Sequence, residues 1–586
     1  MQLRRLIPTV FLLGSLAALA PPAHVVAQET APETPPAEAP PETSSEEIAN
    51  EGSEPFFDTV DVNIVNVEVY VTDKKGNRIT GLTKDDFVLE VDRKPVTITN
   101  FYAVEDGAAR GDGIEMLPPP EEPGRPVDDE PPVPEEQQLH LIVYVDNLNL
   151  HPFTRNKAFR FIRTFLRERV GDEDRVMLVT YERSMHVRHP FTSDPELIAS
   201  ALYELETHTG NAVHFDSDRR DILDAIYEAE QFYHVRGRAT TYAESIYNDM
   251  SFTLRAIDDM VETLAGLPGR KAILYVSDGL SMRPGEDIFY ALEERFRDSG
   301  QGSVLMEIHR YDMTRDYQRL TAKANANRVT FYTLDAAGLR TYSYMDASNA
   351  TPQGGAFIDQ VHFSNLQNSL VYMAQETGGA VIMNTNDFTN GLNQVADDFE
   401  SYYSLGFSSG SNESGRYHNV QVKVKGDDGK KYKVRHREGY RDKPMSTRMA
   451  DSTLAALHFG YQSNPLDVEL EFGKETPEDR GRRFLVPISV RIPIGRLSFL
   501  PQEEFHRGRV RLYIAALDDE GGVSPVQDVP VPIDIPSAEF AGAQDQFYKY
   551  DVTLQMRKGR QVVAVGVHDE IGAVTGFVTR GVSIGG

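Results

Sequence analysis

The stretch that decides the fold runs Leu139-His-Leu-Ile-Val-Tyr-Val-Asp-Asn-Leu-Asn-Leu150. Its apolar run ends at a carboxylate, Asp146, which is followed by the amides of Asn147 and Asn149. The run predicts a buried parallel strand, because such strands are covered on both faces and read as continuous apolar sequence. In an open α/β sheet, ligands bind beyond the carboxyl ends of the strands. The stretch therefore predicts a binding site at one edge of a sheet.

Strand-like and helix-like patterns alternate over residues 139–408. The predicted strands are 139–146, 175–181, 271–277, 328–335, 380–383 and 402–407. Apolar residues spaced three or four apart lie between them and predict helices, with further helical material at 231–250 and 284–326. This alternation predicts an α/β domain with a doubly wound, mainly parallel sheet.

Alternating apolar and polar residues flank this region on both sides and predict β modules. Residues 59–105 predict a small β module, and 411–441 predict a hairpin that completes it. Residues 481–586 predict a C-terminal β-sandwich of immunoglobulin-like or transthyretin-like type. Residues 106–138, rich in Pro and Glu, and residues 442–480 are expected to be linkers. A chain of 586 residues is too long for one core, so a multidomain α/β plus β protein is expected.

The N-terminal segment is typical of export. Arg4 and Arg5 precede an apolar stretch, and small residues end at Ala27, so residues 1–27 predict a Sec-type signal peptide. A retained anchor is the alternative. Residues 28–58 contain no Lys or Arg and predict a disordered, acidic, Pro-rich spacer. No other stretch is apolar enough to span a membrane, so we expect a periplasmic or extracellular protein with no span after cleavage.

Composition excludes several classes of function. The formal net charge of -29 opposes binding to nucleic acid, because long-range repulsion acts against approach. The sequence has no cysteine, which excludes disulfides, thiolate metal sites and a cysteine nucleophile. A protein partner of unknown identity is the expectation that remains.

Several short stretches together resemble the VWFA-related proteins of acidobacterial type, in which a von Willebrand factor A domain sits among β modules. They are Gly81-Leu82-Thr83 with Asp85-Asp86-Phe87, Leu267-Pro268-Gly269-Arg270-Lys271-Ala272 with Ser277-Asp278-Gly279, Leu334-Asp335-Ala336-Ala337-Gly338-Leu339, Thr377-Gly378-Gly379, Tyr403-Ser404-Leu405-Gly406-Phe407 and Arg437-Glu438-Gly439-Tyr440. The resemblance spans about residues 58–441. It implies an A domain inserted into one β module that is formed by the segments before and after it.

The resemblance also implies a metal-ion-dependent adhesion site. Such a site holds Mg²⁺ or Mn²⁺ with Asp-x-Ser-x-Ser after the first strand, a Thr on a second loop and an Asp after the fourth strand. Here Leu148 and Leu150 stand in both serine positions, so the site is degenerate. Asp146 and Asp278 match its two aspartates, while the threonine loop is ambiguous between Thr207 and Thr209.

Two interpretations of this sheet edge stay open. In one, Asp146, Asn149 and Asp278, with Asp216 or Asp218, form an altered oxygen site for Mg²⁺, Mn²⁺ or Ca²⁺. In the other, Asp146 braces the loops, and binding needs no metal. The two leucines favour the second interpretation.

Two catalytic patterns are weaker. Ser408 lies in a Gly-x-Ser-x-Gly pattern, but a nucleophile elbow needs a helix after the serine, and the following residues start a helix poorly. His186, His189, His208 and His214 lack the tight spacing of a zinc site.

The leading hypothesis is an exported, noncatalytic protein-interaction or adhesion-type protein. Its partner would bind at Asp146, Asn147, Asn149 and Asp278. The alternatives are an envelope hydrolase that uses Ser408 or a histidine-bound metal, and a structural envelope scaffold.

Overall fold

The computed structural model describes residues 64–105, 108–111, 138–171, 174–207, 212–297, 303–340, 355–410, 415–426 and 431–585. The expected signal peptide (1–27) and acidic spacer (28–58), together with His208 and Thr209, lie outside the described residues. None of the described helices is long and apolar enough to cross a membrane.

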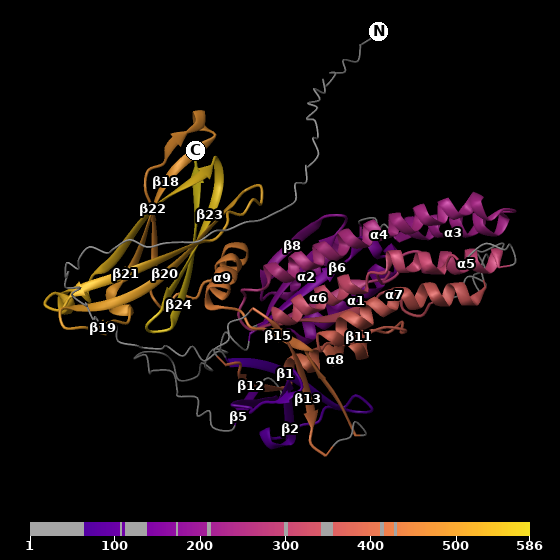
Figure 1. The fold of residues 1–586 in the computed structure, drawn as a ribbon, viewed down its shortest axis with the longest axis horizontal. Helices are drawn as coiled ribbons and strands as arrows, with labels where there is room; N and C mark the ends of the chain where they lie inside the picture. Colours follow the sequence, from indigo (N-terminus) through magenta and orange to yellow (C-terminus); the bar gives the residue numbers. More distant parts are fainter. Residues whose placement is uncertain are drawn as a thin grey trace, which may run out of the picture. The chain divides into compact units, whose positions relative to one another are not determined.

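A six-stranded sheet forms the centre of the α/β domain (Figure 1). Its strand order is β11-β10-β9-β6-β7-β8, and all neighbours are parallel except β7 and β8 at one edge. The doubly wound, mainly parallel sheet predicted from the sequence is therefore present. The strands are β6 (Leu139–Val145), β7 (Arg175–Tyr181), β8 (Met185–Thr192), β9 (Arg270–Ser277), β10 (Val329–Asp335) and β11 (Val381–Ile382).

Helices cover both faces of this sheet because alternate side chains of each strand point to opposite faces. In β6, Leu141, Val143 and Val145 pack into one apolar core, and Ile142 and Tyr144 pack into the other. The first core also takes side chains from α1 (Pro152–Arg169), α2 (Pro195–Leu205) and α8 (Thr389–Glu400). The second takes side chains from α4 (Phe232–Thr263), α6 (Thr314–Ala326) and α7 (Ala356–Glu376).

A separate apolar cluster joins α3 (Ala212–Glu228), α4, α5 (Glu286–Phe296) and the start of α7. The 32-residue α4 contributes to this cluster with its first half and to the sheet core with its second half. The helical material expected at 231–250 is therefore the first part of one long helix.

The N-terminal β module is built from segments on both sides of the α/β domain. β1 (Ile64–Asp73) pairs with β12 (Tyr402–Ser408) and β14 (Tyr432–His436), and β2 (Phe87–Val91) pairs with β13 (Tyr417–Val424). The remaining strands are β3 (Lys94–Pro95), β4 (Asn100–Glu105), β5 (Ala108–Gly111) and β15 (Gly439–Arg441). β5 belongs to the stretch expected to be a linker.

The position of β12 corrects the prediction, which placed residues 402–407 in the parallel sheet. β12 instead lies between β1 and β4, antiparallel to both. Tyr403, Leu405 and Phe407 alternate into the core of the β module. An apolar run predicts a strand, but it does not say which sheet the strand joins.

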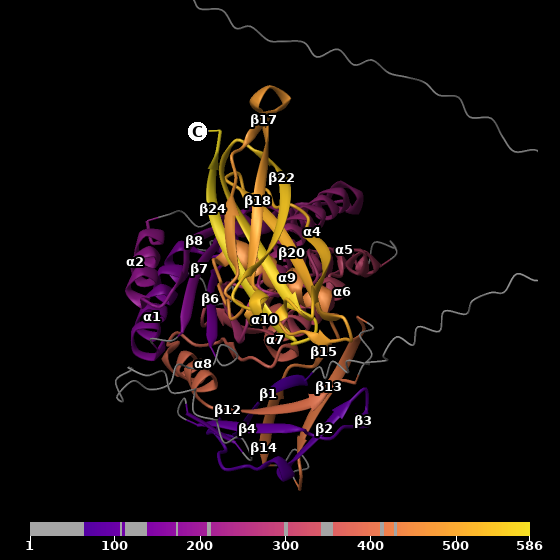
Figure 2. The ribbon, with the colours of Figure 1, turned by 90° about the vertical axis from the view of Figure 1, so that its left-hand side faces the viewer.

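The C-terminal domain consists of two antiparallel sheets that enclose one apolar core, and Figure 2 looks onto it in orange and yellow. One sheet holds β16 (Glu469–Phe472), β17 (Thr476–Glu478), β18 (Arg483–Pro493) and β22 (Phe547–Arg557). The other holds β19 (Leu500–Pro501), β20 (Phe505–Asp518), β21 (Gln527–Pro536), β23 (Gly559–Asp569) and β24 (Val574–Ile584). An immunoglobulin-like type for this domain stays a prediction.

The prediction of a linker at residues 442–480 is wrong for most of this segment. This segment contains α9 (Met445–Phe459), and β16 and β17 follow it. Met449, Ala456 and Leu457 of α9 pack against Tyr513 of β20 and Ala564 of β23. The helix thus covers part of a sheet that would otherwise expose apolar side chains.

Candidate functional site

The candidate site lies where the order of the strands reverses. From β6 the chain continues to β7 and β8 on one side, and β9, β10 and β11 then follow on the other side. Ligands bind at such a switch point, outside the carboxyl ends of the strands. Asp146 directly follows β6 and Asp278 directly follows β9, so the two aspartates lie on both sides of the switch point.

Asp146 is fully buried, and its carboxylate is occupied by internal hydrogen bonds. Its Oδ2 accepts from the Tyr275 hydroxyl at 2.5 Å, the Ser277 hydroxyl at 3.2 Å and the Asn149 side-chain amide at 2.9 Å. Burial raises the pKa of Asp146 to about 6, although these hydrogen bonds act in the opposite direction. The carboxylate therefore braces the loop after β6 from within.

Asn147 and Asn149, which follow Asp146, are also buried and form hydrogen bonds within the protein. Asn147 accepts a hydrogen bond from Arg155 of α1 at 2.6 Å and donates one to Glu182, just beyond β7, at 2.9 Å. The backbone carbonyl of Asn149 accepts from the backbone N–H of Asp278 at 3.1 Å. The side chain of Asn147 and the backbone of Asn149 thus tie the loop after β6 to its neighbours on both sides.

The leucines in the serine positions have a packing role. Leu148 packs into the core on one face of the sheet, and Leu150 packs into the core on the other face. Both are buried. The loop thus contributes an apolar side chain to each core where the adhesion-site pattern has hydroxyl ligands.

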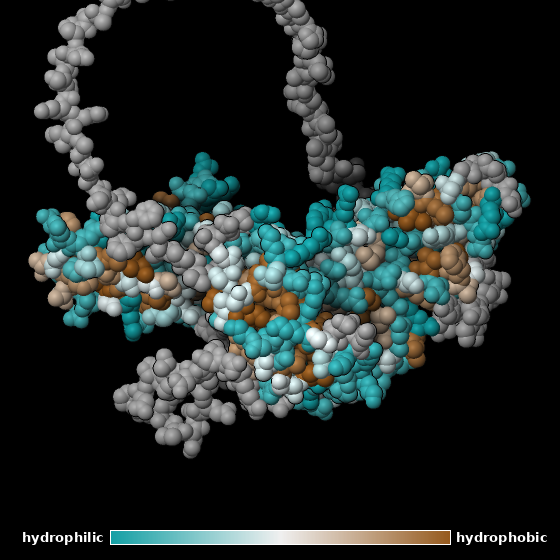
Figure 3. All heavy atoms as spheres, turned by 60° about the horizontal axis from the view of Figure 1, so that its bottom comes forward, coloured by the Kyte–Doolittle hydropathy of each residue, from teal (hydrophilic) through white to brown (hydrophobic). Residues whose placement is uncertain are grey.

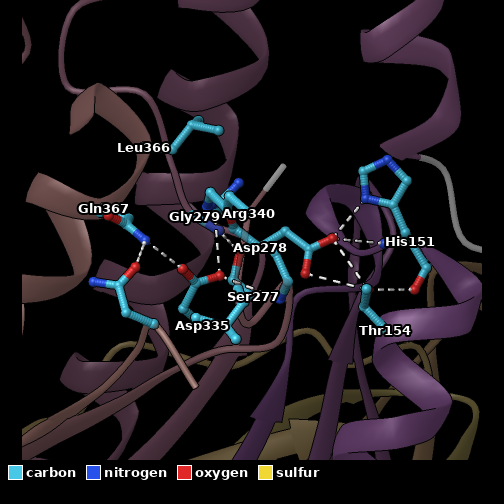
Figure 4. Close-up of polar contacts among 12 residues, drawn as sticks. His151, Thr154, Ser277, Asp278, Gly279, Asp335, Arg340, Leu366 and Gln367 are labelled. Atoms are coloured by element: carbon cyan, nitrogen blue, oxygen red, sulfur yellow. Dashed lines mark hydrogen bonds and ion pairs between the residues drawn. The ribbon is translucent and has the colours of Figure 1, made fainter. Parts of the chain in front are cut away.

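His151 bridges two carboxylates at the centre of the site. Its Nδ1 lies 2.6 Å from Asp278 Oδ2, and its Nε2 lies 2.8 Å from Asp216 Oδ2. The backbone N–H of His151 also donates to Asp278 Oδ2, and the Thr154 hydroxyl lies 3.3 Å from both oxygens of that carboxylate (Figure 4). The hydrogen bonds to Asp216 and Asp278 raise the pKa of His151 to about 10.

Asp216 and Asp218 both belong to α3. The Asp216 side chain is 54% exposed and reaches His151. Burial opposes its ionisation, but the hydrogen bond and charge of His151 outweigh this effect, and the pKa of Asp216 is lowered. Asp218 is exposed, and no described hydrogen bond or ion pair joins it to Asp146, Asp278 or His151.

Another buried carboxylate, Asp335, ends β10. It accepts from Arg340 Nη2 at 2.9 Å and from the Gln367 amide at 2.9 Å. The same Arg340 nitrogen donates to the Asp278 carbonyl at 2.5 Å, so Arg340 connects the loops after β9 and β10 (Figure 4). Burial raises the pKa of Asp335.

These contacts involve residues that the sequence prediction missed, namely His151, Thr154, Asp335 and Arg340. For Asp335 the signal was present, because it ends an apolar strand as Asp146 does. His151 directly follows the quoted stretch, but nothing in a linear pattern shows that its ring faces Asp216.

A pocket with a volume of about 170 Å³ opens above the switch point. Its polar wall includes His151, Asp216, Asp278 and Arg340, and its apolar wall includes Phe215, Ile246 and Met250. His362 also lines it, and burial lowers the pKa of His362 to about 4, so that this ring is neutral near pH 7. The pocket thus combines a carboxylate–imidazole bridge with an apolar wall.

These residues do not fit a divalent-cation site as they are arranged. The Asp146 carboxylate faces inward onto Tyr275 and Ser277, and Asp278 and Asp216 share one imidazole ring. Among the described residues, no group of three or more His, Asp or Glu side chains is arranged to hold a metal ion. The set predicted to bind Mg²⁺, Mn²⁺ or Ca²⁺ is therefore not arranged as a metal site, because Asp146, Asp216 and Asp278 each direct one oxygen to a hydrogen-bond partner within the protein.

The structure gives little support to the weaker catalytic patterns. Ser408 ends β12, and the next described element is the strand β13, whereas a nucleophile elbow leads into a helix. His186 contacts Ser184, and His189 contacts the Pro190 carbonyl. His214 is exposed on α3. Within the described residues these histidines form no metal-binding group.

No protein-family model and no curated protein matches the sequence. Solved structures that are similar in part include the conserved hypothetical protein BatB from Bacteroides thetaiotaomicron, at 12% identity over 44% of this chain and 96% of that chain, with a TM-score of 0.21. Another is a von Willebrand factor type A protein from Catenulispora acidiphila, at 10% identity over 85% and 72%, with a TM-score of 0.21. A third holds three N-terminal domains of the type V pili tip protein Mfa5 from Porphyromonas gingivalis, at 8% identity over 74% and 75%, with a TM-score of 0.25.

These likenesses are partial. The doubly wound order of the central sheet, with one antiparallel edge strand, agrees with the von Willebrand factor A-related fold that the sequence resemblance implies.

Proposed function

We propose that this chain is an exported, noncatalytic interaction protein whose α/β domain binds a protein partner at the carboxyl edge of its central sheet. The observation that carries the proposal is a set of large apolar side chains exposed on segments that also contribute residues to the pocket. Phe153 is 82% exposed, Leu339 is 60% exposed and Val213 is 57% exposed.

These three residues come from different elements, and each lies within two positions, along the chain, of a residue that lines the pocket. Phe153 lies two residues after His151, Leu339 precedes Arg340, and Val213 follows Ala212, which also lines the pocket. Exposed apolar groups that lie together mark interaction sites, and aromatic residues are enriched in interfaces. Apolar residues interrupt the mostly hydrophilic surface on the face drawn in Figure 3.

The predicted contact residues need a different role. Asp146, Asn147, Asn149 and Asp278 are buried, so their side chains cannot form most of a partner interface. They hold the loops after β6 and β9 in place. We assign partner contact to Phe153, Leu339 and Val213, which are exposed on the adjoining segments, and the half-exposed Asp216 adds a charge.

A capture experiment tests the proposal. Two forms of residues 28–586 would be compared: the unchanged protein and an edge variant that carries Phe153→Asp and Leu339→Asp. Each would be used to capture proteins from an envelope extract of the source cells. Quantitative mass spectrometry would measure the captured proteins. The matched control carries Phe505→Asp and Phe547→Asp, which alter side chains 40% and 41% exposed in the C-terminal domain. Loss of one interface hot spot costs about 2 kcal/mol or more, roughly thirty-fold in affinity.

The expected result is a partner that the unchanged protein and the control recover and the edge variant loses. Equal recovery by all three proteins would contradict binding at the sheet edge. Loss in the control alone would favour the scaffold alternative, in which the C-terminal domain makes the contact.

A further inference from the structure

We propose that the imidazole ring of His151 takes the place of a divalent cation at the carboxyl edge of the central sheet. His151 and a divalent cation would then compete for the carboxylates of Asp278 and Asp216. The proposal concerns the ion chemistry of the site, and it stands whether or not a partner binds there.

The geometry requires both ring nitrogens of His151 to donate. Each nitrogen lies within 2.8 Å of an oxygen of a different carboxylate. An ionised carboxylate only accepts hydrogen bonds, and a neutral imidazole has one donor nitrogen and one acceptor nitrogen. Two carboxylate partners at these distances therefore select the doubly protonated ring, which carries a positive charge.

The backbone fixes the ring in this position. His151 is the N-cap residue of α1, and Pro152 follows as the first helical residue. The backbone N–H of His151 donates to Asp278 Oδ2 at 3.0 Å, so the carboxylate also lies at the positive end of the helix dipole. The ring and backbone of one residue thus satisfy the oxygen that an adhesion site would direct to its metal.

The environment of the ring explains why a cation would compete with it. A protonated imidazole has no lone pair for a metal and repels a second cation. If the ring is removed, the carboxylates of Asp278 and Asp216 lose their shared counter-charge, and the Thr154 hydroxyl stays beside Asp278. Oxygen donors of this kind suit Mg²⁺ and Mn²⁺, which keep several waters and so can span the space the ring leaves.

Access to the carboxylates is open on one side. The Asp216 side chain is 54% exposed, and both carboxylates line the pocket above the switch point. An ion with its waters can therefore enter from solvent. Leu148 and Leu150 occupy the two serine positions both with and without the His151 ring. The cation site exposed by removal of the ring would therefore differ from a standard adhesion site.

Titration with Mn²⁺ tests the competition, using calorimetry and the electron paramagnetic resonance signal of free Mn²⁺. The proteins are the unchanged chain, His151→Ala, His151→Ser, and His151→Ala combined with Asp278→Asn. Serine is a favoured N-cap, so His151→Ser keeps the start of α1 if alanine weakens it. His214→Ala, an exposed histidine on α3, is the matched control.

The expected result is one Mn²⁺ bound by His151→Ala or His151→Ser about ten-fold or more tighter than by the unchanged chain, with no gain in His214→Ala. Asp278→Asn should abolish the gain. The proposal is overturned if folded His151 variants bind Mn²⁺ no more tightly than the unchanged chain, or if the gain survives Asp278→Asn. Because no partner is present, this result is separate from that of the capture experiment.

Discussion

His151 Nδ1 lies 2.6 Å from Asp278 Oδ2, although the two residues are 127 positions apart in the chain. The contact joins the start of α1 to the loop after β9, across the point where the strand order reverses. Its consequences for charge, stability and packing can each be measured.

The charge of His151 should persist well above neutral pH. Asp216 and Asp278 raise the pKa of His151 to about 10, so the ring should stay protonated at pH 8. We expect Asp216→Asn to lower that pKa, because it removes a carboxylate partner of the ring. The titration of the His151 ring carbon proton by NMR measures both values, and an unchanged pKa in Asp216→Asn would contradict the bridge. Asp218→Asn is the control.

The same bridge should make stability depend on pH. Because the folded pKa of His151 is raised from 6.5 to about 10, its stabilising contribution is fully present below pH 6.5 and is lost as pH rises through 10. The difference in unfolding free energy between the unchanged protein and His151→Gln should therefore shrink as urea denaturation is moved from pH 7 to above pH 10. His214→Gln should show no such trend. A constant difference for His151→Gln would argue that the bridge does not form.

Tyr275 and Tyr144 offer a matched pair of substitutions beside Asp146. The two tyrosines face each other on adjacent strands, but the Tyr275 hydroxyl donates to Asp146, and the Tyr144 hydroxyl is buried with no described hydrogen-bond partner. Tyr275→Phe should lower the unfolding free energy at pH 8 by about 1.5–3 kcal/mol, the usual value for a hydrogen bond to a charged group. Tyr144→Phe should be neutral or stabilising. Equal losses in urea denaturation would contradict this assignment.

Leu150 should be important for packing. It is fully buried in the core that faces α1, so Leu150→Ala should cost about 2–5 kcal/mol of unfolding free energy. Leu197→Ala alters a leucine 46% exposed on α2 and should stay within about 0.5 kcal/mol. Thermal and urea unfolding of both variants measure the difference. A small loss of unfolding free energy in Leu150→Ala would contradict a packing role for Leu150.

The sequence by itself determined the elements of the central sheet and the edge at which polar residues gather. The apolar runs before Asp146 and Asp278 predict buried parallel strands, and the carboxyl ends of parallel strands meet at one edge, so the neighbourhood of these aspartates follows from local pattern. The two leucines in the adhesion-site pattern likewise indicate an altered site from the sequence alone.

Only the tertiary structure decided what those side chains do. β12 joins the N-terminal β module by pairing with β1 and β4, which lie about 340 and about 300 residues earlier in the chain, and no local pattern encodes that pairing. Asp146 turns inward because Tyr275 and Ser277 of the neighbouring strand offer donors to a buried carboxylate. His151 becomes a fixed cation because folding brings α3 and the loop after β9 to its two ring nitrogens, and charge at that point depends on distances that exist only in the folded chain.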